Sequence, residues 1–501
     1  MQWFVAPSIF VSVVLLTTAV YFSVFLKSWV LNHTRFRFGA IAVVLLASML
    51  AVGVASKRFD RLPWDPVLAS FGIGSPINFA KDSLDLNENE VVSRENWSPA
   101  ATPVESPNII LFMADSINVN HLSVFGYNRE TDPFLSGLGD LYPNVAIQTG
   151  RATCPDSICA VMSTLLSRRF VDTPTRNHFG LGQILSGLGY DVKFVLVSDH
   201  STHFYRPYVH MLDNESDDIF DFRDTDTPLN SDTLALEGLR ALPDYSGKPT
   251  FIFVFFFSAH VAGENLPEFS VFGDFLADRA YWIREGSPFD AEDLLAIANH
   301  YDNKLLQLNH FMALSWETLQ GKGYTDNSTF LFLADHGEAL GERGVIGHSV
   351  YEEETLRIPF IAASTNREIV LDWENPEQVD IAPTVLSMVG QQSPENWQGS
   401  DLTNRQQDPY SFHETGMRKF HTGENCIGVF APKWSSNSDL RVEACYGGSR
   451  GVSYFVTEIG HDQTYNYVDW STLVLSEKTE IQELLRRAFP RSEVVRQFER
   501  I

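Results

Sequence analysis

Three short apolar segments of the chain end in residues that can bind a metal ion or a phosphate group. They are IILFMA (109–114) followed by Asp115, FIFVFFF (251–257) followed by Ser258, Ala259 and His260, and TFLFLA (329–334) followed by Asp335 and His336. A single aspartate after a strand is more often a helix cap, and a single histidine is more often a satisfied core residue. Three such strand ends together indicate one site, because ligands of open α/β sheets bind just beyond the carboxyl ends of the strands.

Two carboxylates and an imidazole are offered by Asp115, Asp335 and His336. This set suits Zn²⁺ with one coordination position left for a nucleophile or substrate, and Mn²⁺ is the alternative. Calcium prefers oxygen ligands throughout, so His336 argues against it. His348 follows His336 by twelve residues, beyond a glycine-rich turn. We expect His348 to return over the site and face transferred phosphate oxygens or a second metal ion.

A candidate nucleophile lies in the segment TGRATCPDSICAVMS (149–163). A glycine-bearing turn that runs into an apolar helix directs backbone N–H groups and the helix N-terminus at an anion. Thr153 stands where we expect this helix to begin, so it is either a capping threonine or the nucleophile. A bound metal lowers the pKa of a hydroxyl group and thereby supplies the activation that an isolated threonine lacks.

The elements that must position these residues alternate between strands and helices. Apolar runs of the right length for buried parallel strands are 109–114, 193–198, 251–257, 329–334 and 358–363. The clearest helical pattern runs from Ala291 to about Gln320. This alternation predicts an α/β sandwich around a mostly parallel central sheet. From about residue 405 the pattern changes to short strand-like runs and a final helix, Thr479–Phe489, which we interpret as an antiparallel addition to the catalytic domain.

Two apolar segments near the N-terminus, 8–26 and 38–55, contain no charged residue and are long enough to cross a bilayer as helices. The short connection between them carries only basic charges, which places it in the cytoplasm by the positive-inside rule, although basic residues after the second segment oppose this orientation. We therefore expect two transmembrane helices within 1–58, a neck or linker at 59–106, a catalytic domain at 107–404 and its C-terminal addition at 405–501. Everything after about residue 60 would then lie outside the cytoplasm.

The composition excludes some partners and leaves others open. The chain has 501 residues and a formal net charge of −26, and an acidic surface repels the phosphates of a nucleic acid, which argues against such a partner. The four cysteines, Cys154, Cys159, Cys426 and Cys445, lack a zinc-finger spacing. Cys426 and Cys445 could close a hairpin, but four cysteines allow three full pairings, and unpaired buried thiols are equally compatible with the sequence. We expect a monomer.

Two longer blocks resemble the bacterial phosphoethanolamine transferases of the alkaline-phosphatase/sulfatase superfamily. DSINVNHLSVFGYNRETDPFL (115–135) is similar to that family's E-T-x-R-x-D-H-F-S-x-x-G-Y-x-R-x-T-x-P-x-L pattern. DHGEALGERGVIGH (335–348) matches the pattern D-H-G-E-S-L-G-E-x-G-x-x-x-H, including the spacing to the last histidine. The shorter motifs YDN (301–303) and VDIAPTVL (379–386) also fit, so the resemblance covers residues 108 to 390 approximately.

The resemblance implies an alkaline-phosphatase/sulfatase-like fold and a set of roles for the site residues. Asp115, Thr153, Asp335 and His336 would hold the metal, and Thr153 would carry the phosphoryl group transiently. His260 and His348 would bind the transferred phosphate or a second Zn²⁺, and act in catalysis. The donor implied is phosphatidylethanolamine, and the acceptor is a hydroxyl group of a glycan or lipid sugar, as in lipopolysaccharide modification. The location implied is the bacterial inner membrane, with the catalytic domain in the periplasm.

The sequence departs from the family pattern at several points. Asp115 replaces a glutamate, and Thr149 stands where the family has a cysteine, so the family's disulfide from that position to Cys159 cannot form. The family's phosphate-contact loop is replaced by SDHSTH (198–203), in which His200 and His203 are candidates for binding the substrate phosphate. These departures leave the metal chemistry intact and bear on the identity of donor and acceptor.

Other functions use related chemistry. A glycerophosphate transferase or a phosphodiesterase would share the threonine and the metal site. A sulfatase needs C-x-P-S-R, with its cysteine converted to formylglycine. Aligning Pro155 with that proline puts Thr153, which cannot be converted, at the cysteine position. An inactive binding domain would be expected to have lost some of the ligands, whereas all of them are present.

Overall fold

The computed structural model describes residues 96–100 and 106–498. Short gaps within this range are 173–178, 198–211, 213–214, 221–230, 262, 277–288, 349, 366–374, 405–408, 416–424, 447–450 and 462–463. The two predicted transmembrane helices, most of the predicted neck, His200 and His203 lie outside the described residues. Among the described residues, no helix is both long and apolar enough to cross a membrane.

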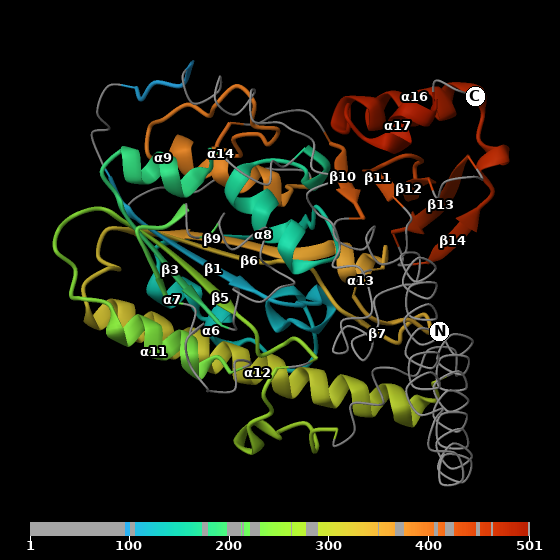
Figure 1. Ribbon diagram of the computed structural model, residues 1–501. Coiled ribbons are helices and arrows are strands. Elements are labelled where there is room, and N and C mark those ends of the chain that lie inside the picture. The colour runs from blue at the N-terminus through green and yellow to red at the C-terminus, as the bar shows by residue number, and fades with distance from the viewer. Residues whose placement is uncertain are drawn as a thin grey trace, which may run out of the picture. The chain divides into compact units, whose positions relative to one another are not determined.

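A seven-stranded sheet forms the centre of the fold, in the order β2-β9-β6-β1-β5-β3-β4 (Figure 1). Its strands are β1 (Asn108–Ala114), β2 (Asn144–Arg151), β3 (Asp191–Leu196), β4 (Asp218–Phe220), β5 (Thr250–Phe256), β6 (Ser328–Ala334) and β9 (Arg357–Ser364). β1 pairs in parallel with β5 on one side and with β6 on the other. The carboxyl ends of these three central strands therefore meet at one edge of the sheet, where the sequence places its candidate ligands.

One strand that was predicted to be parallel to its neighbours is antiparallel to them. Residues 358–363 were expected to form a parallel strand, but β9 runs antiparallel to both of its neighbours, β6 and β2. The sheet is therefore mixed, with parallel pairing from β6 across to β4. An apolar run that is buried on both faces has the same composition in either direction, which is why the sequence could not determine it.

Helices cover both faces of the sheet, so the fold is a three-layer sandwich (Figure 1). On one face lie α8 (Ser157–Leu166), α9 (Leu181–Gly187) and α14 (Ile381–Met388). On the other lie α6 (Pro133–Ser136), α7 (Leu138–Leu141), α11 (Thr233–Ala241) and the long α12 (Ala291–Gly321). The start of α12 is fixed by Asp290, whose side chain accepts hydrogen bonds from the N–H groups of Glu292 and Asp293.

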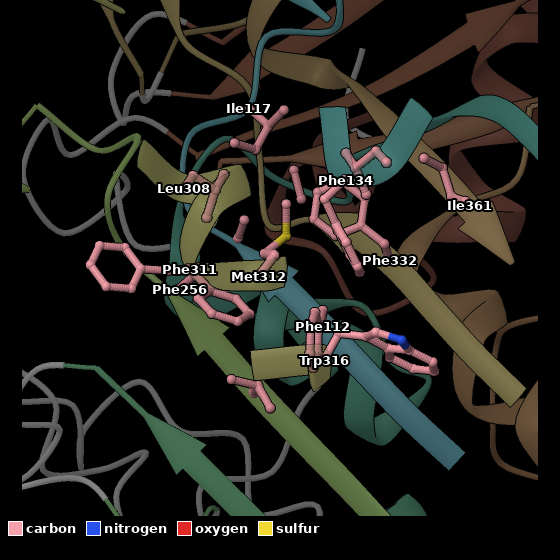
Figure 2. Close-up of a cluster of buried hydrophobic side chains, with 14 of the residues drawn as sticks. Phe112, Ile117, Phe134, Phe256, Leu308, Phe311, Met312, Trp316, Phe332 and Ile361 are labelled. Atoms are coloured by element: carbon pink, nitrogen blue, oxygen red, sulfur yellow. The ribbon is translucent and has the colours of Figure 1, made fainter. Parts of the chain in front are cut away.

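The core beneath α12 follows from the alternation of side chains along the strands. Phe112 of β1, Phe256 of β5 and Phe332 of β6 point to the same face, where Met312 and Trp316 of α12 pack on them (Figure 2). All five side chains are at least 96% buried. Burying a large apolar side chain contributes about 1.5–3 kcal/mol, so this layer holds the central strands in register and fixes their carboxyl ends.

The C-terminal part of the chain forms a second, antiparallel sheet, as the sequence predicted. It has the order β10-β11-β12-β13-β14. These strands are β10 (Ser411–Glu414), β11 (Asn425–Ala431), β12 (Ser438–Tyr446), β13 (Val452–Gly460) and β14 (Tyr465–Val468). Both sheets belong to one compact unit of the chain. The predicted final helix, Thr479–Phe489, is instead α16 (Leu475–Ala488), and a further helix, α17 (Glu493–Phe498), follows it. The helix that was predicted to be the final one is therefore followed by another.

The structure selects one of the three cysteine pairings. Cys426 and Cys445 face each other across β11 and β12 and form a disulfide, as the hairpin interpretation allowed. Cys154 and Cys159 form the second disulfide, with Cα atoms 6.1 Å apart. Cys159 is thus bonded within its own segment, although Thr149 rules out the disulfide that the family resemblance would suggest.

Candidate active site

Three predicted metal ligands meet at the carboxyl ends of β1 and β6. Ala114 and Ala334, the last residues of these strands, are register partners, so Asp115 and Asp335 leave the sheet side by side. The Nε2 atom of His336 lies 3.5 Å from Oδ2 of Asp335 and 3.9 Å from Oδ1 of Asp115. One ligand atom from each residue lies within 4.8 Å of the others. All three side chains are buried.

Hydrogen bonds orient these side chains so that specific atoms face one another. The Nδ1 atom of His336 lies 2.9 Å from the carbonyl oxygen of Gly337, which leaves Nε2 directed at the carboxylates. Oδ1 of Asp335 accepts hydrogen bonds from the backbone N–H groups of Ser116 and His336. Among the described residues, the buried Oδ2 atom of Asp335 has no hydrogen-bond partner. A buried carboxylate oxygen that lacks a hydrogen-bond partner and lies beside an imidazole nitrogen is well suited to bind a metal ion.

The electrostatics of the site also fit a cation. Burial raises the pKa of Asp335 well above its usual value, and the neighbouring Asp115 carboxylate raises it further. Burial likewise raises the pKa of Asp115, partly offset by attraction to His336. Burial and repulsion from His348 lower the pKa of His336 to about 3, so its ring is neutral and able to bind metal at physiological pH. A divalent cation would relieve the repulsion between the two buried carboxylates.

A tyrosine of α12 holds the loop that carries Asp115. The hydroxyl of Tyr301 donates a hydrogen bond to the carbonyl oxygen of Ser116 at 2.6 Å, and accepts one from the N–H of Asn118 at 2.8 Å. Ser116 has a left-handed backbone conformation, with φ of 64°, which is unfavourable for a residue that has a Cβ atom. The Tyr301 hydroxyl, which is buried, compensates this strain and fixes the position of the Asp115 carboxylate.

His348 lies beside His336, and His260 lies beside His348. The ring centroid of His348 is 4.5 Å from that of His336 and 5.2 Å from that of His260. Nδ1 of His348 lies 2.9 Å from Oε2 of the buried Glu338. Burial alone would lower the pKa of His348, but the Glu338 carboxylate outweighs it and raises the pKa to about 9. His348 is therefore protonated at neutral pH when no metal is bound.

A second group of potential metal ligands overlaps the first. His336, Glu338 and His348 also offer ligand atoms that lie within 4.8 Å of one another. The predicted second metal position used His260 and His348, and the structure adds Glu338 as a further ligand candidate beside His348.

The segment that was expected to supply the nucleophile is arranged differently from the prediction. α8 begins at Ser157, with Asp156 as its N-cap, and not at Thr153. Thr153 is fully buried, and its hydroxyl has no hydrogen-bond partner among the described residues. The hydroxyl that lies at the ligand cluster is that of Ser157, 3.3 Å from Oδ2 of Asp115 and 3.4 Å from Nε2 of His336.

The sequence contains a signal that would have located this helix start. A residue before proline is disfavoured in the helical conformation, so Pro155 makes a helix that already includes Cys154 unfavourable. Aspartate is a stronger N-cap than threonine, and Asp156 follows that proline directly. Its Oδ1 atom accepts a hydrogen bond from the N–H of Cys159 at 3.1 Å. Together these features place Ser157 in the first helical position.

The fold and this site together define an α/β protein of the alkaline-phosphatase/sulfatase type. A sequence model of the sulfatase family matches residues 107–391, which is more than half of the chain. The chain therefore belongs to this family.

Individual relatives agree with this assignment. The phosphatidylethanolamine transferase Mcr-1 of Escherichia coli is 21% identical over 337 residues, which cover 63% of this chain and 60% of Mcr-1. The zinc complex of the C-terminal periplasmic domain of EptC from E. coli superposes with a TM-score of 0.50 at 16% identity, covering 61% of this chain and 89% of that domain. BT4656, solved with D-glucosamine-2-N,6-O-disulfate, has a TM-score of 0.57 at 14% identity, with coverage of 77% and 98%. The chain spans less than two thirds of the length of the sequence relatives that it matches.

Proposed function

We propose that this chain is a metal-dependent transferase that moves phosphoethanolamine from phosphatidylethanolamine to a hydroxyl group of a glycan or lipid sugar. One observation carries the proposal: a buried cluster of Asp115, Asp335 and His336 has a side-chain hydroxyl within hydrogen-bond distance of two of its members. A centre of this kind suits the transfer of a phosphoryl group through a covalent intermediate. The similarity to Mcr-1 supports the choice of donor.

The metal would be held by Asp115, Asp335 and His336, with Zn²⁺ as the preferred ion and Mn²⁺ as the alternative. When bound, such an ion lowers the pKa of an adjacent hydroxyl group and neutralises charge on phosphate oxygens. A second Zn²⁺ could be held by His348 with Glu338 or His260, whose side chains surround the same space. Nitrogen and oxygen ligands are compatible with zinc at both positions.

The reaction would proceed in two displacement steps on phosphorus. In the first, a side-chain hydroxyl of segment 149–163 attacks the donor phosphate, and the bond to the diacylglycerol oxygen breaks. A histidine of the site that does not hold a metal ion, His260 or His348, is suited to donate a proton to that leaving oxygen. In the second, the acceptor hydroxyl displaces the enzyme residue from phosphorus. Thr153 was the predicted carrier of the phosphoryl group in this scheme, and Ser157 is its competitor.

The N-terminal segments 8–26 and 38–55 suit a donor that has two acyl chains. A catalytic domain tethered at the outer face of the bacterial inner membrane would reach phosphatidylethanolamine without extracting it from the bilayer. The acyl chains could stay in the lipid while the head group enters the site. We propose that the enzyme acts there as a monomer on a glycan or lipid-sugar acceptor.

The test is release of diacylglycerol from fluorescent phosphatidylethanolamine by the purified full-length protein with Zn²⁺. We expect release by the wild type, and loss of release after treatment with a chelator or in Asp335→Asn. Asp217→Asn is a matched control, because Asp217 accepts a hydrogen bond from Val192 at the amino end of β3, away from the cluster. Wild type that releases no diacylglycerol, or Asp335→Asn that releases it normally, would contradict the proposal. Free phosphoethanolamine, or phosphatidic acid with free ethanolamine, would select the phosphodiesterase alternative. Diacylglycerol release from phosphatidylglycerol and not from phosphatidylethanolamine would select the glycerophosphate transferase.

A further inference from the structure

The identity of the nucleophile rests on the proposed function, and the structure distinguishes the two hydroxyl groups that compete for this role. Thr153 was expected from the sequence, but its side chain is 0% exposed and its hydroxyl has no hydrogen-bond partner among the described residues. A nucleophile must reach a substrate and must be activated by a neighbouring group. Neither condition is met by the Thr153 hydroxyl.

The backbone of Thr153 has a structural explanation of its own. Its N–H donates a hydrogen bond to Oε1 of Gln378 at 2.9 Å, and its carbonyl oxygen accepts one from the N–H of Glu414 in β10 at 2.8 Å. The side-chain amide of Gln378 also donates to the carbonyl oxygens of Ala334 and Asp335 at the end of β6. Thr153 therefore connects the segment to both sheets through its main chain, and its hydroxyl is not needed for this.

Ser157 meets the requirements that Thr153 does not. Its Oγ atom lies 3.3 Å from Oδ2 of Asp115 and 3.4 Å from Nε2 of His336, so it contacts ligands that come from two different strands. Its side chain is only partly buried, whereas the ligands around it are fully buried. A hydroxyl in this position can be activated by a metal ion at the cluster and remain accessible to a substrate.

The local backbone also favours a phosphoryl group on Ser157. Ser157 is the first residue of the ten-residue helix α8, whose first-turn N–H groups lack helical partners and whose dipole favours negative charge at this end. The Cys154–Cys159 disulfide closes a short loop that contains Ser157, and both cysteines are fully buried. The disulfide and the Asp156 cap together hold the serine at the centre.

We propose that Oγ of Ser157 is the nucleophile and carries the phosphoethanolamine group. In the first step the Oγ–P bond forms, the bond from phosphorus to the diacylglycerol oxygen breaks, and the serine proton is released to water. The leaving diacylglycerol oxygen takes a proton from water. In the second step the acceptor oxygen bonds to phosphorus, the Oγ–P bond breaks, and Oγ takes a proton again.

Three variants of the full-length zinc-loaded enzyme test this assignment. Ser157→Ala removes the nucleophile and should lower diacylglycerol release by at least about 10³-fold. Ser157→Thr keeps a hydroxyl and should retain measurable release. Thr153→Val keeps the shape of the side chain and removes a buried hydroxyl that has no partner, so release should stay near the wild-type rate. Zinc affinity of Ser157→Ala, measured by competition with a chromophoric chelator, should stay measurable because all three ligands remain.

The second readout is the site of covalent labelling. Enzyme incubated with head-group-labelled phosphatidylethanolamine in the absence of acceptor is quenched, digested, and analysed by fragmentation of the peptide that contains both residues. An adduct on Ser157 supports the assignment. An adduct on Thr153, with release abolished in Thr153→Val and retained in Ser157→Ala, overturns it and leaves the transferase function intact. Absence of both an adduct and diacylglycerol release in the wild type overturns the transferase function as well.

Discussion

Replacing Asp335 with asparagine should stabilise the metal-free protein and weaken its binding of metal. Oδ1 of Asp335 accepts two backbone hydrogen bonds, which an amide oxygen can also accept. Oδ2 is buried and has no partner among the described residues, so an amide nitrogen in its place gives up no hydrogen bond. The substitution removes a carboxylate that burial and Asp115 both disfavour in its charged form.

The expected magnitudes follow from these contacts. An unsatisfied buried polar group costs about 1–3 kcal/mol and a charged one costs more, so metal-free Asp335→Asn should be more stable than metal-free wild type at a pH where Asp335 is charged. The pKa of Asp335 is raised in the folded state, so the contribution of this carboxyl to stability is lost as the pH rises above the ordinary value of 3.8, and the advantage of the variant should grow with pH over this range. Zn²⁺ at about 100 times its Kd should stabilise the wild type by about 2.7 kcal/mol. The variant should gain much less.

Denaturant unfolding with and without chelator, across this pH range, measures both effects. Asp232→Asn is the matched control, since Asp232 is equally buried but both of its carboxylate oxygens accept backbone hydrogen bonds, from Phe257 and Ser258. It should lose stability by a similar amount with and without zinc, and keep the zinc-induced gain. If Asp335→Asn is destabilised equally in zinc and in chelator, Asp335 is a structural carboxylate and the reasoning is refuted.

Further predictions concern the groups around the centre. In Glu338→Gln, the NMR titration midpoint of His348 in the metal-free protein should fall from near 9, because burial remains while the attraction of the Glu338 carboxylate is lost. An unchanged midpoint would contradict the pairing. In metal-free wild type the raised pKa of His348 stabilises the fold below pH 6.5, and this contribution is lost as the pH rises through about 9, a dependence that Glu338→Gln should remove. Tyr301→Phe leaves two buried backbone groups unpaired, so it should lower the free energy of unfolding by about 1–3 kcal/mol. It should also lower zinc affinity by about 10–100-fold, measured by competition with a chelator. Unchanged affinity would show that the hydroxyl does not position Asp115. Replacing both Cys426 and Cys445 with alanine opens a loop with a sequence separation of 19 and should lower the free energy of unfolding by about 3 kcal/mol. Diacylglycerol release by the folded protein should stay unchanged. Loss of release in fully folded protein would show that the second sheet contributes to catalysis.

The central strands and the ligands at their ends were predictable because each rests on a local pattern. Uninterrupted apolar runs identified β1, β5 and β6, and the residues that follow parallel strands must emerge at the same edge of a sheet. That rule alone predicts that Asp115 and Asp335 lie close to each other. The direction of β9 was not predictable, because burial on both faces removes the alternation that could have distinguished its environment.

The details that orient the site depend on contacts between distant parts of the chain. The hydrogen bond from Tyr301 to the carbonyl of Ser116 joins residues 185 positions apart, and no local pattern indicates it. The choice between Thr153 and Ser157 depends on where one helix begins, and a shift of a single helical turn exchanges the buried hydroxyl for the one at the cluster. Pro155 and Asp156 contain this information, but it becomes decisive only when the position of Asp115 is known.

The intact mass of the zinc-loaded protein after incubation with phosphatidylethanolamine, without acceptor, tests the central claim most directly. The account predicts a mass increase equal to one phosphoethanolamine group, accompanied by an equivalent amount of diacylglycerol, and loss of this increase when an acceptor sugar is added. A protein that stays unmodified under these conditions, or one that gains mass only with phosphatidylglycerol as the donor and then by one glycerophosphate group, would contradict transfer of phosphoethanolamine through a covalent intermediate.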